Sequence, residues 1–568
     1  MTKQKKHMKT WNYYVNKTVE SEKVATQFNL RPLLAQILLN RGINDVDKFL
    51  DPKLNYLNDP FEIPDIEKAA RRVLLAKERG EKVLVYGDYD VDGVTGTTLL
   101  VKTLEQIGIK AEYYIPHRYD EGYSLSVDAV KKIAAKGTNL IITVDCGISA
   151  AKEITLANSL GMEVVITDHH NLPEKLPVAF AIVNPKQLPA GHPSRNLAGV
   201  GVAFKFVWAL LRTAGIRESA FLMSLLDLVA LGTFADVVPL TAENRILAVH
   251  GLSQLAEKKR LGLRYLADAA GINGKISINQ VHFGLAPRIN AAGRLEHASK
   301  SVDLFLTDDP IVAKSLAQEL SRINSRRQDI GTAIKEEVFA LIDDNYVAEN
   351  KVIVLAGANW HSGVIGIVAS KVAETRFRPT ILIGIGEGVG RGSARSFNGF
   401  NIYEILAQNQ DLFLDFGGHE GAAGFAITIE NIPVLQARIK EQADKTITPE
   451  DMVPKISIDA KIEPAEITLG LVKELDVLAP YGEGNQQPVF VTEGLRLADY
   501  KKVGKEGQHL KAWFTRDGVR LETIAFGLGH IAESFNYQKK YSIAYKLESN
   551  EFNGFETAQL SLVDIREE

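Results

Sequence analysis

Three aspartates separated by single residues are the stretch of this sequence most suggestive of chemistry. Asp88, Asp90 and Asp92 follow a short β-branched run and precede a periodic apolar segment. The run from Val83 to Tyr86 predicts a buried strand, and the segment from Val94 onward predicts a helix. In an extended loop alternate side chains point the same way, so the three carboxylates repel one another unless a cation neutralises them. The stretch therefore predicts a metal site at a strand end.

Two common loops fail to explain these aspartates. An EF-hand loop needs a Glu at its twelfth position, which counted from Asp88 is occupied by Leu99, and the preceding element is a predicted strand. A P-loop needs a Lys after its last glycine, but Gly93-Val-Thr-Gly96 is followed by Thr97 and Thr98. The remaining interpretation is a site for a hard metal ion.

More polar residues follow the next predicted strands. Apolar runs predict strands over Ala111 to Ile115, Leu140 to Val144, Glu163 to Thr167 and Ala181 to Val183, with helices such as Ser126 to Ala135 and Ala150 to Leu160 between them. This alternation is typical of a doubly wound parallel sheet, whose ligands bind beyond the carboxyl ends of its strands. Asp145 and the run Asp168-His169-His170 fall at such ends. We therefore expect them to join the three aspartates.

A further carboxylate comes from an apolar helix predicted over Leu225 to Ala235. Asp227 and Asp236 are nine residues apart, which on one regular helix places them on opposite faces. Only one of them is therefore expected to reach the site. Asp236, at the helix end before Val237-Val238-Pro239, is freer to turn into it.

The second half of the chain begins with a long polar helix predicted over Ile311 to Ile342, of the kind that connects two lobes. Arg322, Arg326 and Arg327 lie on one side of it and suit either a phosphate backbone or a solvated helix face. A second α/β unit follows, with strands over Lys351 to Leu355 and Thr380 to Ile385.

Two glycine-rich segments in this second unit are candidates for anion binding. Arg391 to Ser396 and Gly417 to Gly424 are interpreted as glycine-rich turns whose backbone amides can approach an anion, with donors added by Ser393, Arg395 and His419. Tight packing of a helix on a sheet would require the same glycines. Both interpretations stay open.

Short alternating strands follow residue 451 and predict a small β-barrel. Lys501, Lys502, Lys505 and Lys511 are interleaved with Trp513 and Phe514. Such a pattern suits a barrel that stacks bases and binds phosphates, but also a structural barrel with solvated lysines.

The composition limits the class of protein. Of 568 residues, 45% are apolar and 24% are charged, as in folded globular proteins. A net charge of −4 provides no overall attraction to nucleic acid, so such binding depends on local basic clusters. The single cysteine, Cys146, excludes an internal disulfide and a thiolate zinc cluster, and is expected to be a buried structural residue. Neither a signal peptide nor a membrane span is indicated, so we expect a cytoplasmic protein.

The combined residues at the sheet edge define a reaction class. Several carboxylates and one or two histidines form an oxygen-rich site that suits Mn²⁺ or Mg²⁺, although zinc stays open. An excess of carboxylates typically holds two ions roughly 3.5–4 Å apart, bridged by a carboxylate and a water. Such a pair activates the water and neutralises an in-line phosphoryl transition state. We therefore expect hydrolysis of phosphoesters or phosphoanhydrides.

Four motifs together resemble those of the DHH phosphoesterase superfamily. They are Gly87-Asp-Tyr-Asp-Val-Asp-Gly93, Asp145-Cys-Gly147, Asp168-His-His170 and Leu231-Gly-Thr-Phe-Ala-Asp236. Other motifs narrow the resemblance to its bacterial single-strand-specific 5′→3′ DNA exonucleases: Ala286-Pro-Arg-Ile-Asn-Ala-Ala-Gly-Arg-Leu295, Gly417 to Gly424, and Leu478-Ala-Pro-Tyr-Gly-Glu-Gly-Asn485. The resemblance extends from about residue 30 to the end of the sequence.

The resemblance implies roles for single residues. The implied metal ligands are Asp90, Asp92, Asp145, His169 and Asp236, with Asp145 bridging and Asp90 and Asp92 binding one ion each. The implied catalytic residues are His170, in contact with a metal or the scissile phosphate, and Asp88, as a supporting or direct ligand. The residues implied to grip the DNA backbone and its 5′ phosphate are Arg288, Asn290 and Arg294, with Ser393, Arg395, Gly418 and His419 across a cleft.

The resemblance also implies an architecture. The expected order is an N-terminal helical segment (1–75), a doubly wound parallel-sheet DHH domain (76–305), a connecting helix (306–345), a second α/β DHH-associated domain that binds substrate (346–450) and a C-terminal OB-fold β-barrel that binds nucleic acid (451–568). Single-stranded DNA would be degraded to mononucleotides by two Mn²⁺ or Mg²⁺ ions, in DNA repair and recombination. A single-strand-binding protein and a helicase are the implied partners, and we expect a monomer that does not bind membranes.

Two other functions compete with this one. Within the superfamily, the alternative is a phosphodiesterase for short oligonucleotides or cyclic dinucleotides, which does not need the barrel. A non-catalytic structural subunit of replication assemblies is a different class. Such subunits have typically lost metal ligands, all of which are present in this chain.

Overall fold

The structure is a computed structural model that describes residues 9–15, 17–118, 121–122, 124–217, 219–386, 388–552 and 554–568. Contacts divide the chain into two compact units. The carboxylate unit consists of Asp45–Arg327 together with Pro480–Gln486. The barrel unit consists of the chain up to Asn44 with Gln328–Ala479 and Gln487–Glu568.

A five-stranded parallel sheet forms the centre of the carboxylate unit. Its strands are β2 (Val83–Gly87), β3 (Glu112–Tyr114), β4 (Leu140–Val144), β5 (Glu163–Thr167) and β6 (Ala181–Val183), in the order β3-β2-β4-β5-β6. The chain moves from β2 to β3 on one side and then to β4 on the other, so the topological switch point lies between β2 and β4. Ligands of doubly wound sheets bind beyond this point.

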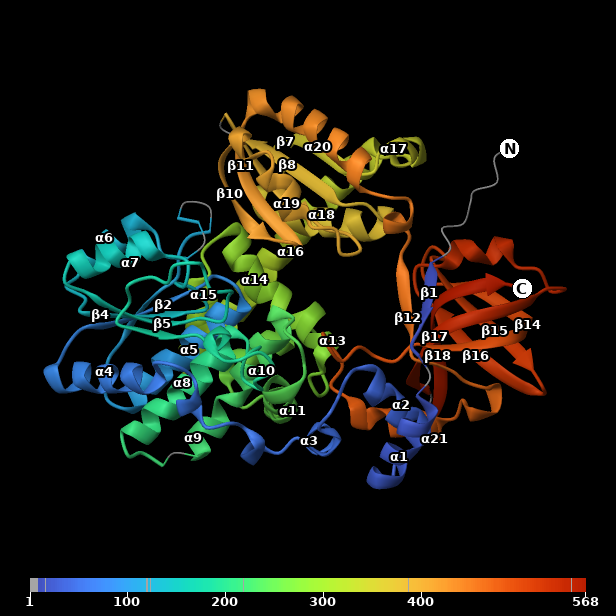
Figure 1. The fold of residues 1–568 in the computed structure, drawn as a ribbon, viewed down its shortest axis with the longest axis horizontal. Helices are drawn as coiled ribbons and strands as arrows, with labels where there is room; N and C mark the ends of the chain where they lie inside the picture. The colour runs from blue at the N-terminus through green and yellow to red at the C-terminus, as the bar shows by residue number, and fades with distance from the viewer. Residues whose placement is uncertain are drawn as a thin grey trace. The chain divides into compact units, whose positions relative to one another are not determined.

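Helices cover both faces of this sheet because residues of each strand alternate between two hydrophobic clusters. Val83 and Val85 of β2 belong to one cluster, and Leu84 and Tyr86 belong to the other (Figure 1). The helices in the first cluster include α4 (Ile66–Arg79), α5 (Val91–Gln106), α8 (Gly199–Thr213) and α10 (Leu226–Asp236), and those in the second are α6 (Val127–Ala135) and α7 (Ala151–Ser159). The predicted doubly wound sheet is confirmed.

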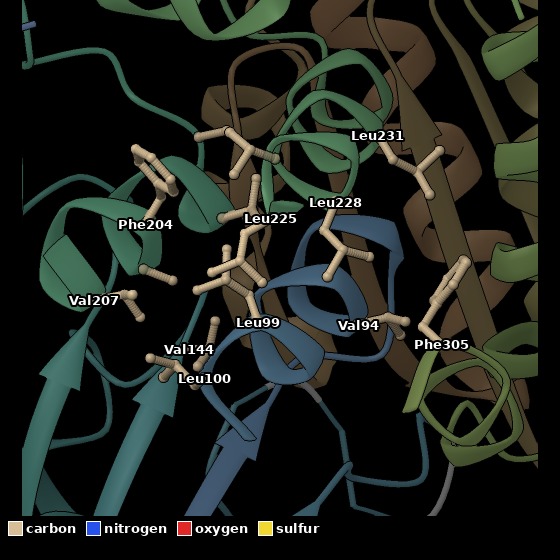
Figure 2. Packing of buried hydrophobic residues seen from close by; sticks show 14 of the residues in the cluster. Val94, Leu99, Leu100, Val144, Phe204, Val207, Leu225, Leu228, Leu231 and Phe305 are labelled. Carbon is tan, nitrogen blue, oxygen red and sulfur yellow. The ribbon is translucent and has the colours of Figure 1, made fainter. Parts of the chain in front are cut away.

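The helix that follows the aspartates, α5, lies in the middle of the larger cluster. Leu99 of α5, Val144 of β4 and Phe204 of α8 belong to this cluster (Figure 2). A Cβ atom at Gly96 would lie 2.5 Å from Cγ1 of Val144, so glycine permits the close approach of α5 to the sheet. This packing fixes the N-terminus of α5, where the carboxylates lie.

The stretch Ser219–Asp236, made of α9 (Ser219–Ser224) and α10, is the one described helical segment long and apolar enough to cross a membrane. However, 56% of it is buried inside the protein, with Leu228 and Leu231 in the core (Figure 2). The position of α10 in the core explains its apolar composition. The other helices of this unit are α3 (Val46–Leu50), α11 (Ala242–Glu257), α12 (Leu261–Ala269), α13 (Ile278–Gln280), α14 (Ala286–Leu295) and α15 (Ser299–Leu306).

The barrel unit contains a mixed five-stranded sheet. Its order is β10-β11-β9-β8-β7, formed by β7 (Ile353–Ala358), β8 (Thr380–Gly386), β9 (Val389–Arg395), β10 (Phe413–His419) and β11 (Ala422–Thr428). Only β7 and β8 pair in parallel. The helices near these strands in sequence are α17 (Asp344–Glu349), α18 (Ser362–Arg376), α19 (Ile402–Ala407) and α20 (Ile432–Thr446).

The first glycine-rich segment is a strand, so its interpretation as a turn is wrong, whereas the second consists of two strands joined by a turn. Residues 391–395 lie within β9, and residues 417–424 form the end of β10, a tight connection and the start of β11. A side chain at Gly392 would overlap with the Phe425 ring, and at Gly366 of α18 a Cβ atom would lie 2.9 Å from the Ser393 hydroxyl. These glycines therefore permit close packing within the sheet and beneath α18.

A closed β-barrel confirms the predicted OB-fold. Strand β14 (Phe490–Val503) pairs with both β15 and β17, which closes the order β14-β15-β16-β18-β17. The other strands of the barrel are β15 (His509–Arg516), β16 (Val519–Ala525), β17 (Lys540–Phe552) and β18 (Phe555–Glu567), and β13 (Ala460–Lys461) pairs with β14 outside the closed order. Strand β12 (Lys455–Ile458) and helix α21 (Leu469–Leu475) precede the barrel. Phe490, Phe514 and Tyr545 are fully buried in it.

A single helical segment was expected over residues 1–75, but the elements of this range belong to two different units. Residues 1–8 and 16 lie outside the described part. Helices α1 (Thr18–Phe28) and α2 (Pro32–Asn40) belong to the barrel unit, whereas α3 and α4 belong to the carboxylate unit. Strand β1 (Thr10–Tyr13) pairs with β12, and Trp11 Nε1 donates to Asp564 at 2.7 Å. The predicted long helix is α16 (Pro310–Leu341), and the boundary between the units falls within it.

Candidate metal centre and nucleic-acid-binding residues

The carboxylates and histidines of the candidate centre come from four places on the carboxylate unit. Asp88 directly follows β2, Asp145 follows β4, and His169 follows β5, while Asp236 is the last residue of α10. Asp90 is the N-cap of α5, where its Oδ1 accepts from the backbone N–H groups of residues 92 and 93 at 2.9 and 3.1 Å. The sheet edge therefore brings together groups that are far apart in sequence.

His169 lies at the middle of the cluster. Its Nε2 is 3.1 Å from Oδ1 of Asp145, 3.7 Å from Oδ2 of Asp236 and 4.0 Å from Oδ2 of Asp92. Three overlapping groups have ligand atoms within 4.8 Å of one another: Asp92, His169 and Asp236; Asp88, Asp90 and Asp145; and Asp145, His169 and His170. Asp145 belongs to two of these groups, which suits a bridging position.

Backbone amides at the start of α8 hold Asp92. The N–H of Gly199 donates to Asp92 Oδ2 at 2.6 Å, and that of Val200 donates to Oδ1 at 2.8 Å. The N-terminus of a helix favours negative charge, so this contact stabilises the ionised carboxylate. A Cβ atom at Gly199 would lie 2.7 Å from Asp145 Oδ1, so only glycine fits. The sequence motifs did not predict this support, although a glycine at the start of an apolar helix can indicate a close contact there.

Asp168 was also missed as an individual residue. It is fully buried, and its Oδ1 accepts from the backbone N–H groups of His169 and His170 at 2.7 and 3.0 Å. Nδ1 of His170 lies 2.7 Å from the same oxygen, and because a carboxylate only accepts, this nitrogen carries the proton. Burial acts to raise the pKa of Asp168, but the hydrogen bonds from His170 and the charges of His170 and His169 together outweigh it, and the pKa is lowered. Asp168 therefore orients His170.

Burial perturbs the protonation of the cluster. Removal from water, and then the charge of Asp90, raises the pKa of Asp92 to about 7. Burial, followed by the charge of Asp92, raises the pKa of Asp236 to about 9. Burial and then the neighbouring His170 lower the pKa of His169 to about 3, so its imidazole is neutral and able to ligate a metal. Without a cation, this site favours protonated carboxyls.

Several buried atoms at the cluster fit a cation. Within the described residues, Asp88 Oδ1, His169 Nε2 and Asp236 Oδ2 are buried and make no hydrogen bond. Buried polar atoms are normally paired, and an unpaired set of ligand atoms pointing to one place indicates a missing partner. Carboxylate oxygens with one or two imidazoles suit Mn²⁺ or Mg²⁺. The residues present therefore fit divalent ions.

The two aspartates of α10 separate as helical geometry predicts. Asp236 faces the cluster, whereas Asp227 accepts from Arg260 Nε and Nη2 at 2.8 and 2.9 Å. Asp227 is thus a structural partner of α12. Cys146 is buried, as expected.

The predicted DNA-binding residues of the carboxylate unit lie on α14. This helix packs closely on the aspartate loop, because a Cβ atom at Gly293 would lie 2.8 Å from the carbonyl oxygen of Tyr89. Asn290 and Arg294 are both half-buried. Arg288 is different, since its guanidinium donates to Gly284 O at 2.7 Å and to Ser321 Oγ at 3.2 Å. Arg288 thus makes hydrogen bonds within the protein.

The other predicted DNA-binding residues share one sheet of the barrel unit. Ser393 and Arg395 lie on β9, and Gly418 and His419 lie on β10, with β11 between the two strands. Arg395 Nη1 donates to Ser393 Oγ at 2.9 Å. A side chain at Gly418, whose φ is 145°, would overlap with the backbone of residues 422 and 423. The glycine therefore permits β10 and β11 to pair closely beside His419.

The barrel surface carries one aromatic residue surrounded by cations. Lys511 and Arg520 lie 5.5 Å from the centre of the Trp513 ring, and Lys501 lies at 5.7 Å. Phe514 was grouped with Trp513 as a base-stacking residue, but it is fully buried in the barrel because neighbouring residues of a strand point to opposite faces. Of these two residues, only Trp513 therefore lies on the outer surface of the barrel, where a base can stack on it.

Known families match three parts of the chain. The DHH family N-terminal domain matches residues 82–233, the DHHA1 domain matches residues 349–445, and the RecJ OB domain matches residues 458–564. The first match contains the predicted aspartate and histidine motifs except Asp236.

Relatives match nearly the whole chain. The single-stranded-DNA-specific exonuclease RecJ of Bacillus subtilis is 38% identical over 95% of this chain and 68% of that protein, and RecJ of Haemophilus influenzae is 35% identical over 94% and 96%. The crystal structure of RecJ from Thermus thermophilus in complex with Mn²⁺ has a TM-score of 0.85 at 33% identity, covering 98% of this chain and 79% of that chain. Its complex with Mg²⁺ has a TM-score of 0.80. The chain therefore belongs to the RecJ family of single-stranded-DNA-specific exonucleases.

Proposed function

We propose that this chain is a metal-dependent exonuclease that degrades single-stranded DNA 5′→3′ to mononucleotides. The observation that carries the proposal is the buried set of ligand atoms around His169 Nε2, with Asp145 shared between two groups. This oxygen-rich set suits two Mn²⁺ or Mg²⁺ ions. Relatives with RecJ structures in complex with these ions support the same cofactors.

The ligands divide into two sets in this proposal. Asp92, His169 and Asp236 would hold one ion, Asp90 would hold the other with support from Asp88, and Asp145, which is shared between two groups of ligand atoms, would contact both. When bound, the ions supply an activated water and neutralise the phosphate charge. The carboxylates release their protons as they bind the ions, because ligation requires the charged form.

His170 is the proposed contact to the scissile phosphate. Its Nδ1 proton is held by Asp168, which fixes the ring orientation. Burial acts to lower the pKa of His170, but its hydrogen bond to Asp168 and the charges of Asp168, Asp88 and Asp90 together raise it. When it carries a proton, Nε2 of the oriented ring can donate to a phosphate oxygen.

The DNA backbone is bound, in this proposal, by Asn290 and Arg294 on α14 and by Ser393, Arg395, Gly418 and His419 on the glycine-rich sheet. The latter set recognises the 5′ phosphate, supported by the pairing of Arg395 with Ser393. Trp513 with its surrounding cations provides a stacking position on the barrel for DNA beyond the site.

The predicted domains take separate tasks. Residues 76–305 hydrolyse the bond, residues 346–450 bind the 5′ end, and residues 451–568 bind the strand, while residues 306–345 connect the first two of these segments along the chain. We place the enzyme in cytoplasmic DNA repair and recombination, as a monomer that works with a single-strand-binding protein and a helicase.

Digestion of single strands labelled at either end tests this function. With Mn²⁺ present, the 5′ label should be released first as a mononucleotide, and EDTA or Asp145→Ala should abolish release. Earlier release of the 3′ label would contradict the direction. Unchanged release by Asp145→Ala would contradict the metal site, and preference for dinucleotides would favour an oligonucleotide phosphodiesterase.

A further inference from the structure

An exposed phenylalanine lies next to the helix assigned to the DNA backbone. Phe283 is 81% exposed, although Val281 and Leu285, two residues to either side, are fully buried. These residues form the π-helical turn η4 (Val281–Leu285), which leads directly into α14. The additional residue of a π-helical turn bulges out of the helix, and such turns occur frequently at functional sites. The buried neighbours therefore hold the Phe283 ring in solvent.

Arg288 stabilises the shape of this turn. Its Nη1 donates to the Gly284 carbonyl at 2.7 Å, its Nε donates to Ser321 Oγ at 3.2 Å, and its Nη2 donates to the Ala269 carbonyl at 3.4 Å. Ser321 Oγ in turn donates to Ala269 O at 3.3 Å. The guanidinium thus connects the turn to the end of α12 and to α16, and each of its three nitrogens donates to a group of the protein.

The surroundings of Phe283 favour a single flat ligand. Among the described residues of α12 to α15, it is the one large apolar side chain that is exposed. Protein partners bind to contiguous apolar patches of several hundred Å², which an isolated ring does not provide. A base of a single strand has an unpaired face, and one aromatic ring is sufficient to stack on it.

We infer that Phe283 stacks on a base of the bound strand, and that Arg288 is a positioning residue for this ring and not a phosphate contact. The inference rests on the proposed function, since it assigns a base position to the same substrate. α14 carries Asn290 and Arg294 immediately after the turn, and its Gly293 packs on the aspartate loop. One rigid segment thus presents a base contact and backbone contacts next to the metal centre.

Binding of the full chain to a fluorescent single strand without divalent ions tests the base contact. Phe283→Ala should weaken binding about fivefold or more, whereas Phe283→Trp should retain affinity because indole also stacks. Ile311→Ala is the matched control, since Ile311 is 79% exposed in the same unit. Equal affinity of Phe283→Ala and the wild type would overturn the inference.

Strands with one abasic site at successive positions identify the stacked base. At one position, loss of the base should weaken wild-type binding but leave Phe283→Ala binding unchanged, because the two changes remove the same contact. Equal losses for both proteins at every position would overturn the inference. If the wild type itself binds no single strand, the proposed function fails instead.

The salt dependence of binding separates the two roles of Arg288. A phosphate contact contributes about 0.7 to the slope of log K against log salt for single strands. Arg294→Gln should lower the slope by this amount. Arg288→Gln should bind the intact strand more weakly with no change in slope, and an abasic site at the position identified above should not weaken its binding further. Ser321→Ala, which removes one acceptor of Arg288, is a milder variant that should act in the same direction. A lower slope for Arg288→Gln would overturn the positioning role.

Discussion

The metal centre and the barrel surface handle charge in opposite ways. At the centre, Asp92 and Asp145 are 1% and 2% exposed and lie among carboxylates of the same sign. On the barrel, Lys511 pairs with Glu522 at 2.6 Å and Lys502 pairs with Glu533 at 2.8 Å, with most of these side chains partly in solvent. Buried like charges need a partner from outside the chain, whereas exposed unlike charges already have one. Changes at the centre should therefore have large effects, and changes on the barrel small ones.

The largest effect on the rate is expected at Asp145, for which Asp517 is a matched control. Asp145 has φ of 60° and Asp517, in the β15–β16 turn, has φ of 52°, and asparagine tolerates this conformation. Asp145→Asn should lower the rate of nucleotide release by about 10³-fold or more, since it removes the bridging charge. Asp517→Asn should leave the rate unchanged. A similar rate for both variants would contradict the difference between the two regions.

The second effect is a dependence of stability and metal binding on pH. In the metal-free protein the folded pKa values of Asp92 and Asp236, about 7 and about 9, exceed the ordinary value of 3.8. Between pH 3.8 and these values the two carboxyls bind more protons in the folded state than in the unfolded state. The stability that they contribute is therefore fully present below pH 3.8 and is lost as the pH rises through about 7 for Asp92 and about 9 for Asp236.

Mn²⁺ should reverse this trend. Because ligation requires ionised carboxylates, the Mn²⁺ affinity should rise by about tenfold or more between pH 6 and pH 8. Thermal unfolding with and without Mn²⁺, and calorimetric titration at each pH, measure both effects. In the variant Asp236→Asn, the Mn²⁺ affinity and the stability should both depend less on pH. A pH-independent Mn²⁺ affinity in the wild type would argue against buried carboxylate ligands.

A smaller effect is expected at the glycine-rich sheet. Arg395→Gln should reduce the rate on strands with a 5′ phosphate by about tenfold, the cost of one charge-assisted contact, and have little effect on strands with a 5′ hydroxyl. Arg438→Gln is the control, because Arg438 pairs with Asp411 at 2.9 Å on the surface of the same unit. If both ends are affected equally, Arg395 does not recognise the 5′ phosphate.

The smallest effect is expected on the barrel. Trp513→Ala should weaken the binding of long strands about fivefold, the cost of one stacked base, and leave the turnover of a short oligonucleotide nearly unchanged. Trp513→Phe should retain most of the affinity. Measurement of KM for a long and a short strand tests this difference, and equal losses on both would indicate that the barrel does not bind DNA beyond the site.

The amino-acid sequence determined the elements of the first sheet and their order. Strands β4, β5 and β6 have the predicted bounds, because continuous β-branched and apolar runs occur only where a strand is buried on both faces. The carboxylates and histidines follow these strands directly, so the parallel sheet was sufficient to predict that they meet. Helical periodicity likewise predicted that Asp236 and Asp227 face opposite ways.

Only the tertiary structure decided which distant groups support these residues. The amides of α8 that hold Asp92, the contacts of Arg288 with α12 and α16, and the burial of Phe514 inside the barrel all depend on packing between elements remote in sequence. Local patterns specify an element and its faces, but not the partner that each face contacts. Glycine shows this limit most clearly, because the same residue permits a turn or a close approach, and only the neighbouring chain decides between them.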